Sequence, residues 1–188
     1  MIGGGLHSRH LHLAGPVDGG AEKLPPIIAR GVLLDMAGLH GLDMLPPAYA
    51  IGPQDLKDCL KHQGIELRPG DVVLIRTGRM RAWPDAAKFT TDAPGLNRDG
   101  ARALAEAGAI TIAADNHALE PLPSTDPENW QPVHTYLLAE AGIPIVEMVN
   151  LEELAAEGVH EFVFFGACIR FRGATGAPMR PVAMPLLQ

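Results

Sequence analysis

Two residues in the second half of the chain, His134 and Glu147, have the types and positions best suited to chemistry. His134 stands at the start of a predicted helix, directly after a proline-rich stretch, and Glu147 ends a predicted strand. A carboxylate at the end of a buried strand is costly unless it is paired or bound to a metal ion. A helix and a strand joined by a short turn at Gly142 bring the helix start and the strand end to one side of an α/β layer, so we expect both side chains to face one site. The alternative is that Glu147 is an ordinary surface residue.

A second polar group, Asp115 and Asn116, follows directly after another predicted strand, and the polar run continues to Glu120. Ligands of α/β sheets gather beyond the carboxyl ends of strands, which makes Asp115 and Asn116 candidate substrate-binding residues. The same residue types also stabilise ordinary turns, so that reading stays equally open. Arg180 is a further candidate because a guanidinium can clamp a carboxylate, although the glycines that precede it would equally suit a tight turn.

The histidines of the N-terminal segment form a possible metal site of their own. His7, His10 and His12 lie close together among glycines, and His10 and His12 would share a face of an extended chain. Imidazole is the commonest metal ligand in proteins. The segment 1–24 has no apolar pattern to anchor it, however, so we expect a loop or remnant there rather than a native metal site.

The elements that must position these residues follow an α/β pattern from residue 25 onward, in which short apolar runs take turns with amphipathic stretches. We expect one compact α/β domain over 25–188, with a mixed sheet and covering helices. Buried strands are predicted at 27–34, 72–77, 109–114, 143–146 and 162–170. Helices are predicted at 53–63 with Gly64 as C-cap, at 97–108 with Asn97 as N-cap, at 133–141, and at 150–157 with Asn150 as N-cap. The four prolines of 121–132 predict a long loop.

Composition and charge exclude several classes of protein. The 188 residues are 47% apolar and 20% charged, which is typical of a soluble globular domain. With 15 basic and 22 acidic residues the formal charge is −7, so nucleic acid is not expected as a partner. The longest apolar run is too short to cross a membrane, and the N-terminus has no secretory pattern. The two cysteines form no framework, and we expect a cytoplasmic protein in which Cys59 is buried.

An ordered set of segments resembles the cyclase family, which includes bacterial kynurenine formamidases and isatin hydrolases. The segments occur in the order of the family and are PIIARGVLLD (26–35), PGDVVLIRTG (69–78), ADNHALE (114–120), VHTYLL (133–138), GIPIVE (142–147), NLEEL (150–154), GATG (173–176) and RPVA (180–183). No single segment is distinctive, but the ordered set is specific.

The resemblance implies a compact α/β fold with a divalent metal, Zn or Mn, that activates water against the carbonyl of an amide or lactam. It also implies that His134 and Glu147 are metal ligands, because they match the late His and Glu positions of the family. Family members tend to form homo-oligomers, so we expect one here, together with a small-molecule substrate.

The chain departs from the family in one respect. Members carry their main ligands in an early motif, His-x-Gly-Thr-His-x-Asp-x-x-x-His, and no stretch here matches it. His7, His10 and His12 come nearest, but their spacing is one residue short, the Gly-Thr is missing and His replaces Asp. The resemblance therefore predicts a family member without the segment that carries the motif. Two functions stay open: a metal-dependent amidohydrolase, or a catalytically inactive member that serves as a binding or oligomerising scaffold.

Overall fold

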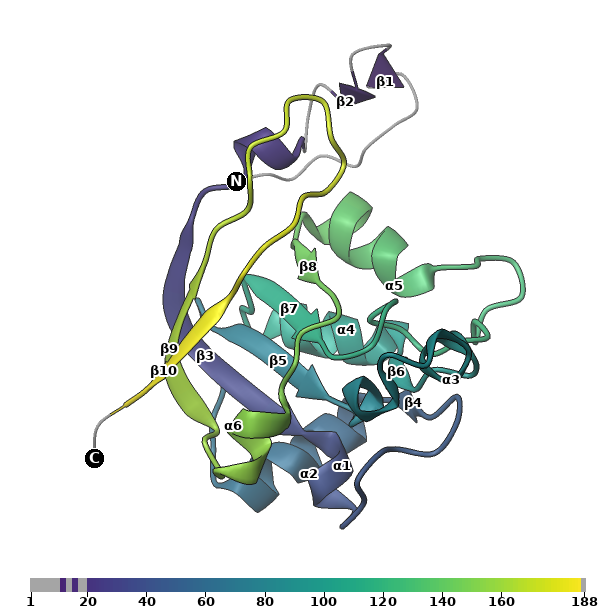
Figure 1. Cartoon of the computed structure of the whole chain (residues 1–188), viewed down its shortest axis with the longest axis vertical. Helices are drawn as coiled ribbons and strands as arrows, with labels where there is room; N and C mark the ends of the chain where they lie inside the picture. Colours follow the sequence, from purple (N-terminus) through teal and green to yellow (C-terminus); the bar gives the residue numbers. More distant parts are fainter. Residues whose placement is uncertain (1–10, 13–14, 17–19, 187–188) are drawn as a thin grey trace.

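The chain forms one six-stranded mixed sheet with helices on both faces, as seen in a computed structural model that describes residues 11–12, 15–16 and 20–186 (Figure 1). The strands are β1 (Leu11–His12), β2 (Gly15–Pro16), β3 (Ile27–Asp35), β4 (Ala50–Ile51), β5 (Val72–Arg76), β6 (Gly95–Leu96), β7 (Thr111–Ala114), β8 (Ile145–Val146), β9 (Glu161–Gly166) and β10 (Val182–Pro185).

The α-helices are α1 (Met36–Leu39), α2 (Pro53–Gln63), α3 (Ala86–Thr90), α4 (Arg98–Glu106), α5 (Pro132–His134) and α6 (Glu152–Ala156). Two short 3₁₀ turns are η2 (Ala21–Lys23) and η3 (Arg79–Ala82), and a π-helical segment, η4 (Thr135–Ala141), continues α5.

The strand order of the large sheet is β10-β9-β3-β5-β7-β8. The four strands β3, β5, β7 and β8 run parallel. Beyond β3, the sheet continues with β9, which is antiparallel to β3, and ends with β10, which is antiparallel to β9. Two small sheets, β1-β2 and β4-β6, stand apart from it. Parallel strands end at a common edge, so the residues that follow β5, β7 and β8 all emerge on the same side of the molecule.

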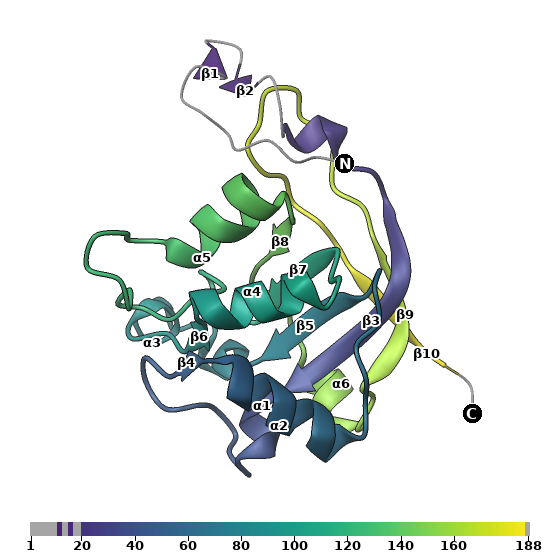
Figure 2. The same cartoon turned by 180° about the vertical axis from the view of Figure 1, so that it is seen from behind.

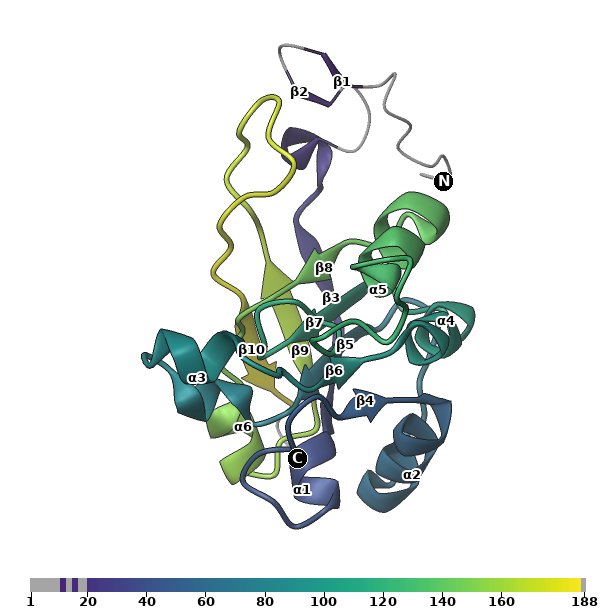
Figure 3. The same cartoon turned by 90° about the vertical axis from the view of Figure 1, so that its right-hand side faces the viewer.

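Alternate residues of each central strand enter two different cores. Val73 and Ile75 of β5 pack into the larger core beneath α2, α4 and η4, whereas Val72 and Leu74 pack into a second core beneath α6. Figure 3 shows α2 and α4 on one side of the sheet and α6 on the other. In the rear view of Figure 2, α4 lies in front of the sheet. Burial on both faces explains why β5 reads as a continuous apolar run rather than as an alternating one.

Most of the predicted elements are confirmed. The four principal strands form, and α2 ends with Gly64 in the left-handed region at φ +68. Asn97 caps α4 by accepting a hydrogen bond from the backbone of Gly100. Cys59 is fully buried, and burial raises the pKa of its thiol to about 12.

Several predicted boundaries are wrong. The strand predicted as buried at 143–146 is only Ile145–Val146 and is half-buried, and the one predicted at 109–114 begins at Thr111. The last strand does not extend to Arg170 but ends at Gly166, where its partner β3 begins at Ile27. Prolines precede Ile27 and cannot donate to a ladder, so β3 offers no partner beyond Gly166. The residues that follow pair only at an isolated antiparallel bridge between Cys168 and Met179, which is too little to continue the strand. The helix predicted from Asn150 begins at Glu152. The side chain of Asn150 accepts a hydrogen bond from the backbone N–H of Glu152, which makes a turn before the helix.

The end of the N-terminal segment is attached to the domain. Ala21 is fully buried and donates a backbone hydrogen bond to Ala174, while the carboxylate of Glu22 accepts one from Gly173. His7 and His10 lie outside the described residues. None of the described helices has the length and apolar character that a membrane span requires.

Candidate functional site

The site lies where the parallel strands end, around a chain of three side chains that we call the Glu120–His134–Glu147 triad. Glu120 comes from the loop after β7, His134 ends α5, and Glu147 follows β8. These residues are brought together by the topology, because β7 and β8 are parallel neighbours.

Glu120 holds the start of α5 and the ring of His134 at the same time. Its side chain is 1% exposed and accepts backbone hydrogen bonds of 3.1 Å from both Val133 and His134. The same carboxylate lies 2.6 Å from Nδ1 of His134. First-turn amides of a helix have no partner within the helix, and here a buried glutamate supplies it. The ring of His134 is therefore fixed in orientation by the residue that caps its helix.

The opposite nitrogen of the ring faces Glu147. His134 Nε2 lies 3.4 Å from Glu147 Oε1, and the two side chains are 19% and 32% exposed. Burial of the ring opposes its charge, but the hydrogen bonds with Glu120 and Glu147 more than offset it and raise the pKa of His134 to about 9. Without a metal ion, the triad is a partly buried carboxylate–imidazolium–carboxylate system.

Backbone hydrogen bonds fix the segment that carries Glu147. Met148 donates to the backbone oxygen of Asn116 over 2.9 Å, and Val149 donates to Ala114 over 3.1 Å. Met148 adopts a positive φ of 58°. These two hydrogen bonds join the loop that follows β7 to the loop that follows β8, which carries Glu147.

Asp115 and Asn116 lie beside this segment, but most of their polar groups are already engaged. The buried carboxylate of Asp115 accepts hydrogen bonds from the backbone and hydroxyl of Thr77 and from the backbone of Gly78, at 2.7–2.9 Å. Burial raises the pKa of Asp115, and these hydrogen bonds oppose the rise. Asn116 donates to Pro94, while its buried Oδ1 has no partner among the described residues. Their predicted contact with substrate stays a prediction.

Arg180 is not brought to the triad by any contact in the described part of the chain. It lies on the connection between β9 and β10, is exposed, and forms no hydrogen bond or ion pair with a described residue. Its predicted role in clamping a carboxylate also stays a prediction.

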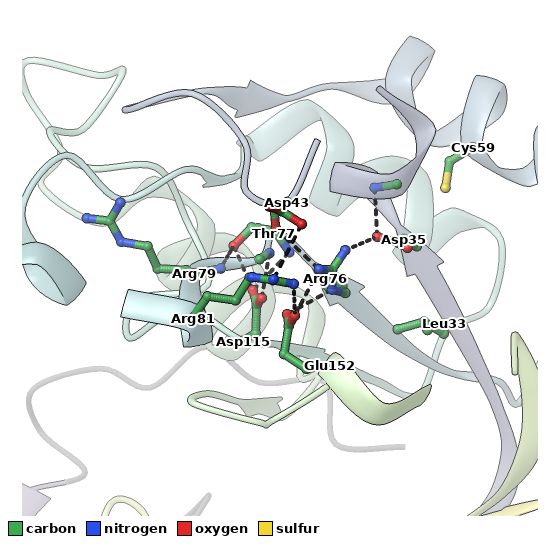
Figure 4. A network of polar contacts seen from close by, with 12 residues as sticks. Leu33, Asp35, Asp43, Cys59, Arg76, Thr77, Arg79, Arg81, Asp115 and Glu152 are labelled. Carbon is green, nitrogen blue, oxygen red and sulfur yellow. Dashed lines mark hydrogen bonds and ion pairs between the residues drawn. The ribbon is translucent and has the colours of Figure 1, made fainter. Parts of the chain in front are cut away.

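A second polar cluster, centred on Arg76, fills the space between the ends of β3 and β5 and the start of α6 (Figure 4). The guanidinium of Arg76 is 6% exposed and contacts Glu152 through Nε at 2.8 Å and Nη2 at 3.0 Å, and Asp35 through Nη1 at 2.7 Å. Arg81 adds a further contact to Glu152 at 3.0 Å. Glu152 is the first residue of α6, so this cluster fixes the C-terminal end of the segment 147–152 that Glu147 begins.

The metal-binding capacity of the site can be judged from its donors. An imidazole nitrogen and a carboxylate oxygen are suitable in type for a divalent cation, and a carboxylate on the second imidazole nitrogen is the usual support for a histidine ligand. The number of donors is too small, because a catalytic metal ordinarily takes about three protein ligands. Within the described residues no group of three or more His, Cys, Asp or Glu side chains is arranged to hold a metal ion.

The profile of a known family, described as "Putative cyclase", matches residues 9–121 of the chain. The chain belongs to the cyclase family. A crystal structure described as that of a novel cyclase has a TM-score of 0.74 and 35% sequence identity, over 84% of this chain and 53% of its own. None of the curated proteins matches the chain significantly.

Two more distant structures share the fold of this cyclase-family chain. An isatin hydrolase bound to the product analogue thioisatinate has a TM-score of 0.71 and 19% identity, over 92% of this chain and 64% of its own. A protein described as a potential metal-dependent hydrolase with cyclase activity has a TM-score of 0.55 and 21% identity, over 84% and 65%. The chain therefore spans between about half and two thirds of the length of these proteins.

Sequence reasoning assigned no role to two residues that organise the site. Glu120 was recognisable as part of the ADNHALE segment, but its partner His134 is 14 positions away, beyond the proline-rich loop. Arg76 ends the apolar run VVLIR, where a lone charge is a signal of a buried partner. Its partners Asp35 and Glu152 come from distant elements and follow only from the fold.

Proposed function

We propose that this chain carries part of the active site of a metal-dependent hydrolase that acts on a small amide or lactam. The observation that carries the proposal is the Glu120–His134–Glu147 triad. A carboxylate fixes one imidazole nitrogen at 2.6 Å, while the other nitrogen and a second carboxylate lie 3.4 Å apart at the strand-end edge. Among the structures with this fold, one is described as an isatin hydrolase and another as a potential metal-dependent hydrolase with cyclase activity, which supports the assignment of the reaction class.

Each member of the triad has a separate task in this proposal. His134 Nε2 and the Glu147 carboxylate would hold a divalent ion, Zn or Mn, together with ligands from outside the described residues. Glu120 keeps Nδ1 protonated and the ring oriented, so that Nε2 presents its lone pair to the site. When bound, such an ion lowers the pKa of a water molecule and polarises a carbonyl group.

Several finer assignments belong to the same proposal. Asp115 and Asn116 form the floor of the site from the loop after β7, and Arg180 approaches the carboxylate that ring opening of a lactam or release from an amide produces. The domain extends over residues 25–188, with segment 1–24 as an appendage, and the protein is a homo-oligomer that acts on a small molecule.

The proposal is tested by hydrolysis of isatin and of an N-formyl arylamine, each with Zn²⁺ or Mn²⁺ added. We expect His134→Ala and Glu147→Gln to lower the rate by about 100-fold or more, since each removes a metal donor. Glu120→Gln should lower it about 10- to 100-fold, which is typical when the residue supporting a metal ligand is lost. His62→Ala, an exposed histidine of α2, is the matched control and should leave the rate unchanged.

Two results would contradict the proposal. A wild-type chain that hydrolyses neither substrate with either metal would favour the alternative, an inactive family member that serves as a scaffold. Hydrolysis that survives His134→Ala would place the reaction elsewhere in the chain.

A further inference from the structure

His117 is a titratable residue next to the triad that the proposed mechanism does not use. It lies in the loop after β7, between Asn116 and the buried residues Ala118 and Leu119. The backbone of Asn116 accepts the hydrogen bond from Met148, the residue that follows Glu147. One hydrogen bond thus places His117 and Glu147 on adjoining strand-end loops. Burial lowers the pKa of His117, and the carboxylate of Glu147 opposes that fall.

The ring of His117 is held from behind by aromatic packing. Its centroid lies 5.7 Å from that of Phe89, which is itself 5.6 Å from Trp83. Arg79 donates to the backbone oxygen of Phe89 over 2.9 Å, so the segment that supports the ring is fixed in turn. A ring packed in this way has a defined orientation, as a residue that positions a ligand requires.

The two nitrogens of this ring are in different surroundings. Nδ1 is buried and has no hydrogen-bond partner among the described residues, whereas the residue as a whole is only partly buried. Because Nδ1 is closed off, Nε2 is the ring nitrogen left to meet a ligand. A proton on Nε2 leaves only a lone pair at the buried Nδ1 and presents an N–H donor to the open side, since neutral imidazole has one donor and one acceptor.

We infer that His117 is a substrate-positioning residue, whose Nε2–H donates a hydrogen bond to an oxygen of the substrate, either the amide carbonyl or the carboxylate formed from it. The inference rests on the proposed function for the identity of the site. The ring does not supply a metal ligand in this assignment, because Nε2 carries the proton that it donates. The backbone hydrogen bond between Met148 and Asn116 holds His117 on the loop next to the one that carries Glu147, which is where the triad would act on a substrate.

The test measures binding of the probe thioisatinate by calorimetry and hydrolysis of isatin, both with Mn²⁺, in three variants. His117→Phe keeps a planar ring against Phe89 but removes both nitrogens, and we expect probe binding and KM to weaken about tenfold while kcat changes less than threefold. His117→Gln keeps an N–H donor near the position of Nε2 and should recover part of the loss. His160→Phe is the matched control, because His160 is a partly buried histidine beside β9, outside the site, and both readouts should stay at the wild-type value.

The outcomes separate this inference from the proposed function. If His117→Phe binds the probe and hydrolyses isatin within twofold of wild type, or if His117→Gln is no better than His117→Phe, the inference is wrong and the proposed function stands. If wild type binds the probe in a His117-dependent way but hydrolyses nothing, the reaction is wrong and the binding role stands. If wild type does not bind the probe, the inference is overturned as well.

Discussion

Replacement of Arg76 by methionine tests how the strand-end edge is held together. Methionine preserves much of the length and volume of the side chain but leaves the carboxylates of Asp35 and Glu152 without their buried partner. Removing one member of a buried ion pair costs about 3–5 kcal/mol, because the other charge stays desolvated. Glu152 keeps Arg81 as a partner at 3.0 Å, so we expect the lower end of this range, about 3 kcal/mol.

The size of the effect can be read from thermal and urea unfolding followed by circular dichroism. For a domain of this length each kcal/mol shifts Tm by roughly 2–4 °C, so Arg76→Met should lower Tm by about 6–12 °C. Arg81→Met is the matched control, because Arg81 is 48% exposed and a pair of that kind contributes at most about 1 kcal/mol.

A triple variant separates the desolvation cost from a simple loss of packing. Asp35→Asn and Glu152→Gln, added to Arg76→Met, replace the charged cluster by neutral groups and should recover part of the lost stability, since no uncompensated charge remains. The reasoning is refuted if Arg76→Met lies within 1 kcal/mol of wild type, or if the triple variant is less stable than Arg76→Met alone.

Three further predictions concern the backbone, the triad and the assembly. Gly78 has φ +80, and a Cβ there would lie 2.1 Å from the backbone oxygen of Asp43, so Gly78→Ala should destabilise the fold by more than about 1 kcal/mol in urea unfolding, whereas Gly176→Ala, in open space, should not. In the metal-free chain, NMR titration of His134 should give a pKa of about 9, and in Glu120→Gln this pKa should fall toward 6.5. The stability that the charged ring contributes is fully present below about pH 6.5 and is lost as the pH rises through about 9. A wild-type pKa at or below 6.5 would contradict this. Several large apolar side chains of β9, β10 and their connection are exposed, so light scattering should find a homo-oligomer, and a stable monomer at micromolar concentration would be evidence against it.

The sequence was sufficient to predict the elements whose signals are local. The apolar run of β5 lies between turn residues, Gly64 closes α2, and Asn97 opens α4, and each of these features depends on residues within a few positions. Glu147 is a candidate from the sequence because a charge directly after an apolar strand is unusual, and the fold brings it within 3.4 Å of His134. Its role as a metal ligand stays a prediction.

The features that could not be predicted depend on contacts between distant parts of the chain. Burial of Arg76 is possible only because Asp35 and Glu152, 41 and 76 positions away, converge on it. The end of β9 at Gly166 depends on where the neighbouring β3 begins, since the apolar residues continue beyond it. Glu120 caps α5 across a long loop, so neither its role nor the orientation of His134 could be read from spacing.

The most direct test of the triad as a metal-facing site is calorimetric titration of the full chain with Zn²⁺ and Mn²⁺. The variants are His134→Ala, Glu147→Gln and a chain in which His7, His10 and His12 are all replaced by alanine. Two donors hold a divalent ion only weakly, so we predict weak wild-type binding that disappears in the first two variants and persists in the third. Tight binding that survives His134→Ala and disappears with the three N-terminal histidines would contradict the assignment and place the metal in the N-terminal segment.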